Sequence, residues 1–304
     1  MDAPPLTLTL PTLRAKAAAL VEMTKYRLSS LVVVTAGAGY VLGGSAAAEP
    51  VAFDGLRCAL VLVGTTLAAF GANALNQCLE VERDRQMQRT RGRPLPSGRL
   101  SLLEGVSWGL LLLVLGVGGL TLLVSPLAAA LAFLVAALYV GVYTPLKPRT
   151  SLNTLAGAVC GAVPPMIGWV ARTGELEPGA WVLFAVLFVW QIPHFLAIDW
   201  YHQDDYEQGG FCMASSVDRS GGFSAHHAVL YSAALLPISV LAPLTGMGGW
   251  LYAAGALVLG TVFLGLSLAW MLRRTRLAAR RLFLASLAYL PLLLALLVLD
   301  PTRP

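Results

Sequence analysis

Three side chains that offer oxygen atoms lie four residues apart at the end of one apolar stretch. They are Asn76, Glu80 and Asp84, and on a helix this spacing places them on one face with about 6 Å between neighbours. Left unpaired, the two carboxylates would repel each other, and a bound cation removes that repulsion. Oxygen ligands without histidine or cysteine suit Mg²⁺, which proteins hold with one or two carboxylates together with substrate phosphates. The alternative is a solvated helix end, but Asn76 lies within the apolar stretch, where polar groups are usually functional.

A second acidic cluster occurs more than a hundred residues later. Its carboxylates are Asp199, Asp204, Asp205 and Glu207. Together with the first cluster, which also contains Glu82, it holds seven of the sixteen carboxylates in the chain. This concentration favours a metal site to which two separate segments contribute.

Basic residues flank the first cluster and one later segment. They are Arg85, Arg89, Arg91 and Arg93, and then Lys147 and Arg149 just after Tyr143. Guanidinium groups suit phosphate oxygens, so acidic and basic clusters together indicate a diphosphate site. The alternative for each basic residue is charge that orients the chain in a membrane. No GxxxxGK motif occurs, so nucleoside triphosphate chemistry has no support.

The elements that must position these residues are membrane-spanning helices. Of the 304 residues, 57% are hydrophobic and 12% charged, whereas a soluble domain has about 45–50% and about 25%. A helix needs about 20 mostly apolar residues to cross a ~30 Å hydrocarbon core, and the apolar runs are continuous rather than alternating as in a barrel. We therefore predict an all-α polytopic membrane protein with about nine transmembrane helices around a central lipid-facing substrate cavity. The predicted spans are Leu31–Ala48, Cys58–Leu79, Val106–Val124, Leu127–Tyr143, Leu152–Val170, Ala180–Trp200, Ala225–Thr245, Trp250–Leu272 and Leu282–Leu299.

The basic residues alternate between the two sides of the membrane. Of the 21 lysines and arginines, 18 lie in the N-terminal segment and in every second connection. The positive-inside rule then places the N-terminus in the cytoplasm and the C-terminus outside. This topology explains the net charge of +5, so we expect no nucleic acid partner. We expect a tail over residues 1–27, its first part short and disordered, a single membrane domain over 28–300 and a C-terminal tail over 301–304.

The polar chemistry is predicted at the cytoplasmic end of the helices. A transporter usually carries ionisable groups or broken helices near the membrane midplane, whereas the centres of nearly all the predicted spans carry no charge. This arrangement suits a substrate with a charged head and a long apolar tail.

Several motifs occur in an order that resembles one family. The chain is similar to the UbiA-type intramembrane prenyltransferases, and within them to the protohaem IX farnesyltransferase (haem O synthase) branch, which the run from Arg89 to Leu95 favours. Two positions depart from the family pattern, because Glu80 stands where many members have Asp and the second acidic motif is not a plain DxxxD. The motifs are NQCLEVERDRQMQRTRGRPLPSGR at 76–99, YTPLKPRTSLNT at 143–154, GAVPPMIGW at 161–169, WQIPHF at 190–195 and DDYEQGGFCM at 204–213.

The resemblance implies transfer of a farnesyl group from farnesyl diphosphate to the vinyl group of haem B, with addition of water, to give haem O and diphosphate. It also implies Mg²⁺ as cofactor. The expected metal-binding and catalytic residues are Asn76, Glu80, Asp84, Asp204 and Asp205, and the expected diphosphate-binding residues are Arg85, Arg89, Arg93, Lys147, Arg149 and Tyr143.

Haem is a substrate in this reaction, and three residues are candidates to contact it. His194, which lies well inside an apolar span, would bind the iron or a propionate, and Trp200 and His202 lie nearby in sequence. The alternative for His194 is a hydrogen-bonded contact between helices.

Two other functions stay open. A UbiA-type enzyme that prenylates another aromatic acceptor, such as a hydroxybenzoate or a quinone precursor, would share the metal site and differ in its acceptor pocket. A non-enzymatic carrier of lipid or haem would keep its activity after the substitution Asp84→Ala. We expect a multi-pass protein of the bacterial inner (plasma) membrane, which the short N-terminal segment favours, or alternatively of the mitochondrial inner membrane. Haem A synthase and oxidase assembly proteins are candidate partners of such an enzyme.

Overall fold

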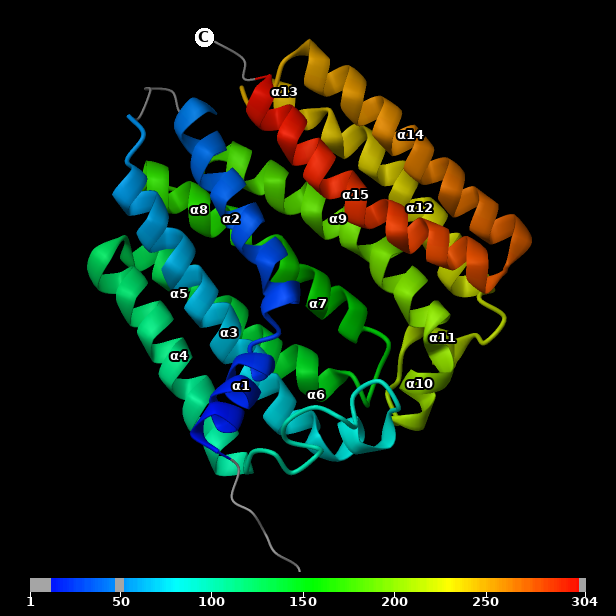
Figure 1. Cartoon of the computed structure of the whole chain (residues 1–304). Helices are drawn as coiled ribbons and strands as arrows, with labels where there is room; N and C mark the ends of the chain where they lie inside the picture. The colour runs from blue at the N-terminus through cyan, green and yellow to red at the C-terminus, as the bar shows by residue number, and fades with distance from the viewer. Residues whose placement is uncertain (1–11, 47–51, 301–304) are drawn as a thin grey trace, which may run out of the picture.

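The computed structural model describes residues 12–46 and 52–300, and every regular element in these residues is helical. Nine helical segments of the described chain are long and apolar enough to cross a membrane, which confirms the predicted number (Figure 1). Ala47 and Ala48, the predicted end of the first span, and residues 1–11 and 301–304 of the predicted tails lie outside the described residues.

Six spans are single helices and three are broken. The single helices are α2 (Tyr26–Ala46), α3 (Gly55–Gln86), α4 (Leu102–Leu123), α9 (Pro178–Tyr201), α14 (Trp250–Arg273) and α15 (Arg276–Leu299). The broken spans are α5 (Pro126–Leu138) with the π-helix η1 (Tyr139–Tyr143) and α6 (Thr144–Leu146), α7 (Asn153–Ala162) with α8 (Pro164–Thr173), and α12 (Gly222–Ser239) with α13 (Leu241–Leu244). Three short helices complete the described chain: α1 (Leu13–Met23), α10 (Gln203–Gln208) and α11 (Ala214–Val217).

Helix α3 is longer than the hydrocarbon core is thick. Asp54 caps its start by accepting a hydrogen bond from the backbone N of Arg57 at 2.9 Å. Its 32 residues span about 48 Å at about 1.5 Å per residue, so about 18 Å extends beyond a ~30 Å core. The oxygen-bearing stripe predicted from the sequence lies in this last part of the helix.

The span of α5, η1 and α6 widens into a π-helical turn next to this stripe. The rings of Tyr139 and Tyr143 stack there with centroids 5.2 Å apart, and the Thr144 hydroxyl donates to the Tyr139 carbonyl at 2.7 Å. Such turns occur frequently at functional sites. Here the turn presents both tyrosines to an internal cavity.

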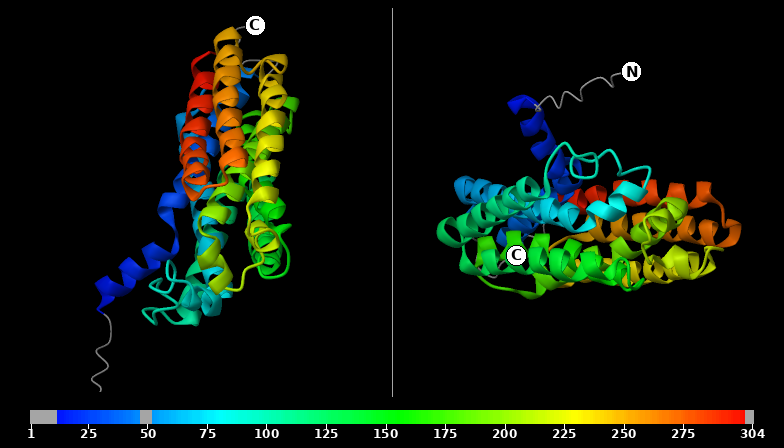
Figure 2. Two further views of the ribbon diagram at one scale, coloured as in Figure 1. Left: turned by 90° about the vertical axis from the view of Figure 1, so that its right-hand side faces the viewer. Right: turned by 90° about the horizontal axis from the view of Figure 1, so that it is seen from below.

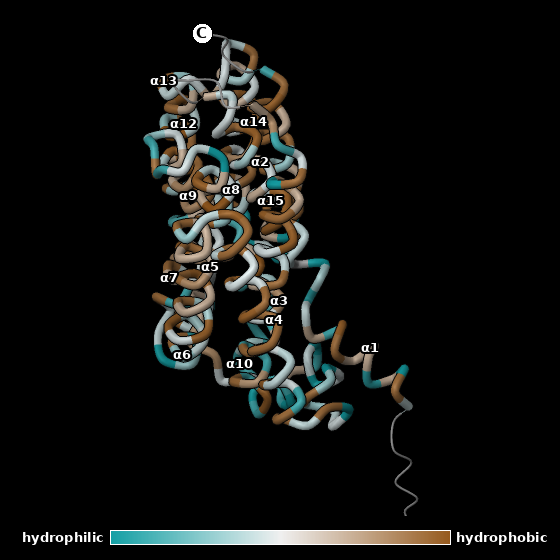
Figure 3. Tube along the Cα trace, turned by 90° about the vertical axis from the view of Figure 1, so that its left-hand side faces the viewer, coloured by the Kyte–Doolittle hydropathy of each residue, from teal (hydrophilic) through white to brown (hydrophobic). Residues whose placement is uncertain are grey.

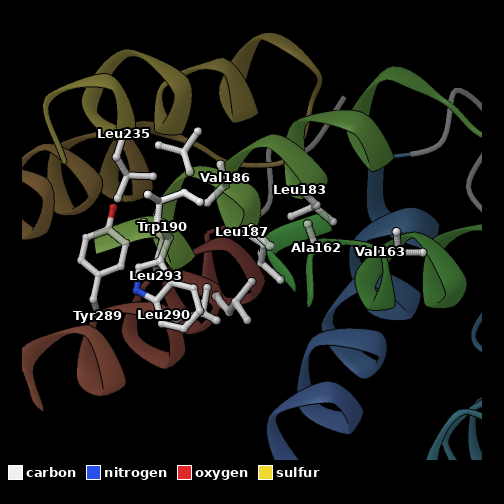
Figure 4. Close-up of a cluster of buried hydrophobic side chains, with 14 of the residues drawn as sticks. Ala162, Val163, Leu183, Val186, Leu187, Trp190, Leu235, Tyr289, Leu290 and Leu293 are labelled. Carbon is white, nitrogen blue, oxygen red and sulfur yellow. The ribbon is translucent and has the colours of Figure 1, made fainter. Parts of the chain in front are cut away.

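Small residues allow α3 and α4 to pack closely, as is common between membrane helices. A Cβ atom on Gly116 would lie 2.4 Å from the backbone N of Ala68, and one on Gly71 would lie 2.6 Å from the carbonyl O of Gly109. Larger side chains pack on the other side of the bundle, where Trp190 of α9 lies against Leu290 and Leu293 of α15 (Figure 4).

The N-terminal segment is not the disordered tail that we expected, at least from Thr12 onwards. It forms α1, whose Lys16 pairs with Glu104 at 2.6 Å and whose Leu20 carbonyl accepts a hydrogen bond from Trp108 at 3.2 Å. Figure 2 shows α1 leaving the bundle at an angle. The expectation was wrong because the contacts that stabilise this short helix come from α4, almost ninety residues away.

Polar residues gather at one end of the bundle. Figure 3 shows hydrophilic segments near α1, α6 and α10, with predominantly hydrophobic helices extending away from them. Helix α1 lies at this end, and α15 finishes at the opposite end (Figure 1), as an odd number of spans requires. The protein is thus a multi-pass membrane protein whose polar end matches the predicted cytoplasmic side.

Candidate functional site

Each oxygen-bearing residue of the α3 stripe is held by a cation from a different segment. All three stripe residues are buried, and together with their partners they form what we call the acceptor ladder. Its pairs are Lys25 Nζ with Asn76 Oδ1 at 2.8 Å, Lys147 Nζ with Glu80 Oε1 at 2.8 Å, and Arg93 Nη1 with Asp84 Oδ2 at 2.7 Å. Arg93 and Lys147, two of the expected diphosphate-binding residues, thus lie beside the stripe.

Local backbone structure delivers each cation to the ladder. Lys25 stands between α1 and α2 with a left-handed backbone (φ 50°), a strained conformation that often marks functional positions. Arg93 comes from the loop after α3, where the Thr90 hydroxyl donates to the Asp84 carbonyl at 2.9 Å and folds the loop back on the helix. Lys147 follows directly after α6.

The two lysines of the ladder have opposite electrostatic environments. Desolvation of the ammonium group, together with nearby Arg93, lowers the pKa of Lys25 to about 7. Burial also opposes the charge of Lys147, but Tyr143 and Glu80 outweigh it, so the pKa of Lys147 lies above its usual value. Because the Tyr143 phenol is neutral near pH 7, we assign the ionic attraction to Glu80, and the Tyr143 ring contributes a cation–π contact at 4.6 Å.

One carboxylate oxygen of the ladder has no hydrogen-bond partner among the described residues. Asp84 Oδ1 is buried without a hydrogen bond in the described chain, and an unsatisfied charged oxygen is unfavourable unless a cation approaches it. The stripe residues of the ladder offer only oxygen atoms as metal ligands, which suits Mg²⁺. No group of three or more His, Cys, Asp or Glu in the described residues comes close enough to hold a metal ion. An ion at Asp84 therefore depends on Glu80, Asn76 and oxygens from a substrate for its remaining ligands.

The second acidic cluster lies at the same end of the bundle but is divided. Asp205 Oδ1 accepts a hydrogen bond from the backbone N of Gln88 at 3.0 Å, and its Oδ2 lies 3.4 Å from Arg89 Nε. Asp204 instead pairs with Arg276 of α15 at 2.5 Å. The structure therefore joins α10 to the end of α3, but it does not bring Asp204 to the acceptor ladder as we expected.

Two of the expected diphosphate-binding residues lie away from the ladder. Arg85 pairs with Glu82, one turn away on the exposed side of α3, at 2.7 Å. Arg149 is exposed. The sequence could not separate these residues from Arg93, because only the folded chain decides which guanidinium reaches the stripe.

An apolar cavity of about 240 Å³ lies directly beside the ladder. Asn73, one turn before Asn76 on α3, lines it, and its amide oxygen lies 3.4 Å from the Tyr139 hydroxyl. Tyr143 also lines the cavity, so a diphosphate at the ladder and an apolar tail in the cavity would be continuous. The remaining lining is mostly apolar and comes from α2, α3, α5, α7, α8, α9 and α15.

The three residues that we expected to contact haem do not lie together in the structure. His194 lines the cavity together with Trp190 and Phe195. Trp200 packs against Trp270 of α14 and does not line the cavity. His202 also lies outside the lining, where burial and nearby Arg89 lower its pKa.

Sequence reasoning missed several residues of the site. Lys25 was counted among the charges that orient the chain, although its position at the start of the first span was visible. Thr144 holds Asn76 in place by accepting from its amide nitrogen at 2.9 Å. Asn73 had a signal that could have identified it, since it extends the polar face of α3 further into the apolar stretch.

Comparison with known proteins agrees with this fold. Two of the similar curated proteins are named protoheme IX farnesyltransferase. That of Solibacter usitatus is 42% identical over 92% of this chain and 97% of its own length. That of Opitutus terrae is 43% identical over 96% of this chain and 97% of its own length.

Solved structures share the fold at low sequence identity. A digeranylgeranylglyceryl phosphate synthase has a TM-score of 0.77 at 17% identity, covering 94% of this chain and 98% of its own. A UbiA homologue from Archaeoglobus fulgidus bound to DMAPP and Mg²⁺ has a TM-score of 0.63 at 12% identity, covering 91% and 98%.

The family model described as the UbiA prenyltransferase family matches residues 33–292. This range contains the whole α3 stripe and both acidic clusters. The long apolar helices, the polar end with its acceptor ladder and these similarities lead to one conclusion: the chain belongs to the UbiA prenyltransferase family.

Proposed function

We propose that this protein transfers the farnesyl group of farnesyl diphosphate to a vinyl group of haem B, with addition of water, to give haem O and diphosphate. The observation that carries the proposal is the acceptor ladder at the mouth of an apolar cavity, in which Asp84 Oδ1 is buried and unpartnered. The near full-length similarity to proteins named protoheme IX farnesyltransferase supports the choice of donor and acceptor.

We propose Mg²⁺ as the cofactor, held by Asn76, Glu80 and Asp84. When bound, the ion would neutralise negative charge on the diphosphate as it departs. The solved relative with DMAPP and Mg²⁺ supports this assignment. Asp205, which contacts the loop after α3, is the member of the second cluster best placed to orient groups around the diphosphate.

The basic members of the ladder would bind the leaving group. Arg93, Lys147 and Lys25 approach from three directions, so they surround a diphosphate at the end of α3. The positive charges of Arg93 and Lys147, and that of Lys25 when it is protonated, would stabilise the charge that grows on the diphosphate in the transition state. Since each cation already contacts a stripe residue, it needs little movement to reach phosphate oxygens.

The cavity would control what happens to the farnesyl cation. Departure of the diphosphate leaves an allylic cation, and the apolar lining keeps bulk water from capturing it too early. Tyr139 and Tyr143 line the cavity beside the ladder, and aromatic rings attract cations. The haem vinyl group would then attack the allylic carbon, and water would capture the second cation.

The proposal is tested by asking which acceptor the protein prenylates. Purified protein is incubated with farnesyl diphosphate, Mg²⁺ and either haem B or 4-hydroxybenzoate, and products are separated by chromatography. We expect haem O from haem B and no prenylated hydroxybenzoate. The opposite result would reassign the protein to another aromatic acceptor, and no product from either would favour a carrier.

We also propose the bacterial inner membrane as the site of action. The bacterial origin of the relatives described above supports this location over the mitochondrial inner membrane. The cytoplasmic end would then take farnesyl diphosphate from the cytoplasm.

A further inference from the structure

A hydrogen-bonded chain links the cavity wall to α15. His194 Nδ1 lies 2.7 Å from the hydroxyl of Ser286, which is fully buried. The same hydroxyl donates to the carbonyl of Phe283 at 2.5 Å, and the carbonyl of Ser286 accepts a hydrogen bond from Trp190 Nε1 at 3.1 Å. These hydrogen bonds thus connect α9 to α15 beside the cavity.

The hydrogen bonds of Ser286 determine which nitrogen of His194 carries the proton. A serine hydroxyl has one hydrogen, and the carbonyl of Phe283 can only accept, so that hydrogen lies between Ser286 and Phe283. The Ser286 oxygen is then left as an acceptor for His194, which must donate from Nδ1. In the neutral ring Nε2 therefore carries a lone pair, and it makes no hydrogen bond within the described chain.

The surroundings of His194 favour an uncharged role for this lone pair. The ring lies among Trp190, Phe195 and Phe283, with centroids 5.4, 5.6 and 5.1 Å away. No carboxylate pairs with it in the described residues. A general base would become a buried cation without a paired charge, which is unfavourable, whereas a ligand to iron donates its lone pair without taking up a proton.

We propose that His194 Nε2 is the axial ligand to the iron of the haem substrate, and that Ser286 is the positioning residue that presents it. This inference rests on the proposed function, because it assumes haem as the acceptor. The Ser286 bond fixes both the proton and the orientation of the ring. Outer-shell partners of this kind typically affect metal affinity by about 10–100-fold.

The first test is spectroscopic and needs no turnover. Ferrous haem B is added to the purified full-length protein, and resonance Raman spectra are searched for the iron–imidazole stretch, identified by its shift in protein labelled with ¹⁵N-histidine. We expect the band in wild type, its loss in His194→Ala, and its return when imidazole is added to that variant. Absence of the band from wild type, or its persistence in His194→Ala, would overturn the inference.

The second test isolates Ser286. Ser286→Ala should weaken haem binding by about 10–100-fold and leave farnesyl diphosphate binding unchanged, while Ser286→Thr, which keeps the hydroxyl, should restore haem binding. The matched control is Ser267→Ala on α14, which removes a buried hydroxyl bonded to Ser232 at 2.8 Å but outside the cavity lining. Equal haem affinities for wild type, Ser286→Ala and Ser267→Ala would show that Ser286 does not position the ligand.

The two failures are distinguishable. If wild type forms no haem O at all, the proposed function is wrong. If wild type forms haem O but shows no iron–histidine band, the reaction stands and only the assignment of His194 and Ser286 is lost.

Discussion

At the scale of single residues, the acidic and basic side chains of this site are paired with one another. Three acceptors on one helix face are each matched by a cation from elsewhere in the chain, and one carboxylate oxygen is left over. Loss of any one cation would leave a buried carboxylate or amide oxygen unpaired, so substitutions here should lower stability as well as activity.

Arg93→Lys tests whether the shape of the guanidinium group is required. Lysine keeps the charge but has a single donor group, so it cannot hold Asp84 and a phosphate oxygen in the same planar geometry. We expect kcat/KM for farnesyl diphosphate to fall about 10- to 100-fold, the value of one charge-assisted hydrogen bond of about 1.5–3 kcal/mol. The control is Arg91→Lys, since Arg91 is exposed in the same loop. Equal kcat/KM values for both variants would mean that Arg93 serves only as a charge that orients the chain in the membrane.

Lys25 gives the metal-free protein a predictable pH dependence. Its pKa is lowered to about 7 in the folded state from about 10.4 in an unfolded chain. Below pH 7 both states bind the proton, and the folded state carries the unfavourable buried charge. Between pH 7 and about 10 the unfolded state binds more protons, so the stability contribution of Lys25 rises with pH by at most about 1.4 kcal/mol per unit.

The measurement is the thermal unfolding midpoint in detergent with EDTA, from pH 6.5 to 9. The difference between wild type and Lys25→Met should change in favour of wild type as the pH rises. A difference that does not vary with pH would mean that the Lys25 ammonium is not desolvated.

Part of the site could be predicted from the sequence. Asn76, Glu80 and Asp84 could be identified because helical periodicity alone places them on one face. Lys25 could not, since its charge is of the kind that membrane topology already explains. The pairing of Asp204 with Arg276 could not either, because it depends on how α15 packs beside α10.

At the scale of helices, close contact between α3 and α4 supports the ladder. Gly116→Val should separate the two helices, because its Cβ would meet backbone atoms of Ala68 at 2.4 Å. Overpacking of this kind usually destabilises by about 1–3 kcal/mol. Gly118→Val is the control on the same helix, because nothing lies within 4 Å of its Cβ position.

The expected result is a lower unfolding midpoint for Gly116→Val and an unchanged one for Gly118→Val. If both variants unfold at the wild-type temperature, the contact between α3 and α4 is not tight. Equal destabilisation of both would attribute the effect to valine in the helix rather than to the crossing.

The number of spans could be predicted because hydropathy and length decide it. The breaks at η1 and between α7 and α8 could not be placed from hydropathy, which reads each broken span as one apolar run. The helix α1 could not be predicted as ordered, because its stability comes from Glu104 and Trp108 on a distant helix.

At the scale of the whole molecule, the polar end defines the side from which the soluble substrate enters. The ladder lies at the end of the bundle that carries α1 and α10, and the C-terminal end of α15 lies at the other (Figure 1). Inside-out membrane vesicles should therefore convert added farnesyl diphosphate, and right-side-out vesicles should not until they are permeabilised. Activity in sealed right-side-out vesicles alone would invert the assigned topology.

The most direct test of the central claim is the rate of haem O formation in wild type, Asp84→Ala and Glu82→Ala, each with Mg²⁺ and with EDTA. Glu82 is the matched control because it is an exposed carboxylate of the same helix, and in the described residues it pairs with Arg85 at the surface. We predict Mg²⁺-dependent haem O formation in wild type and Glu82→Ala, and a loss of about 10³-fold in Asp84→Ala. Formation of haem O by Asp84→Ala at the wild-type rate, or by wild type in EDTA, would contradict the account.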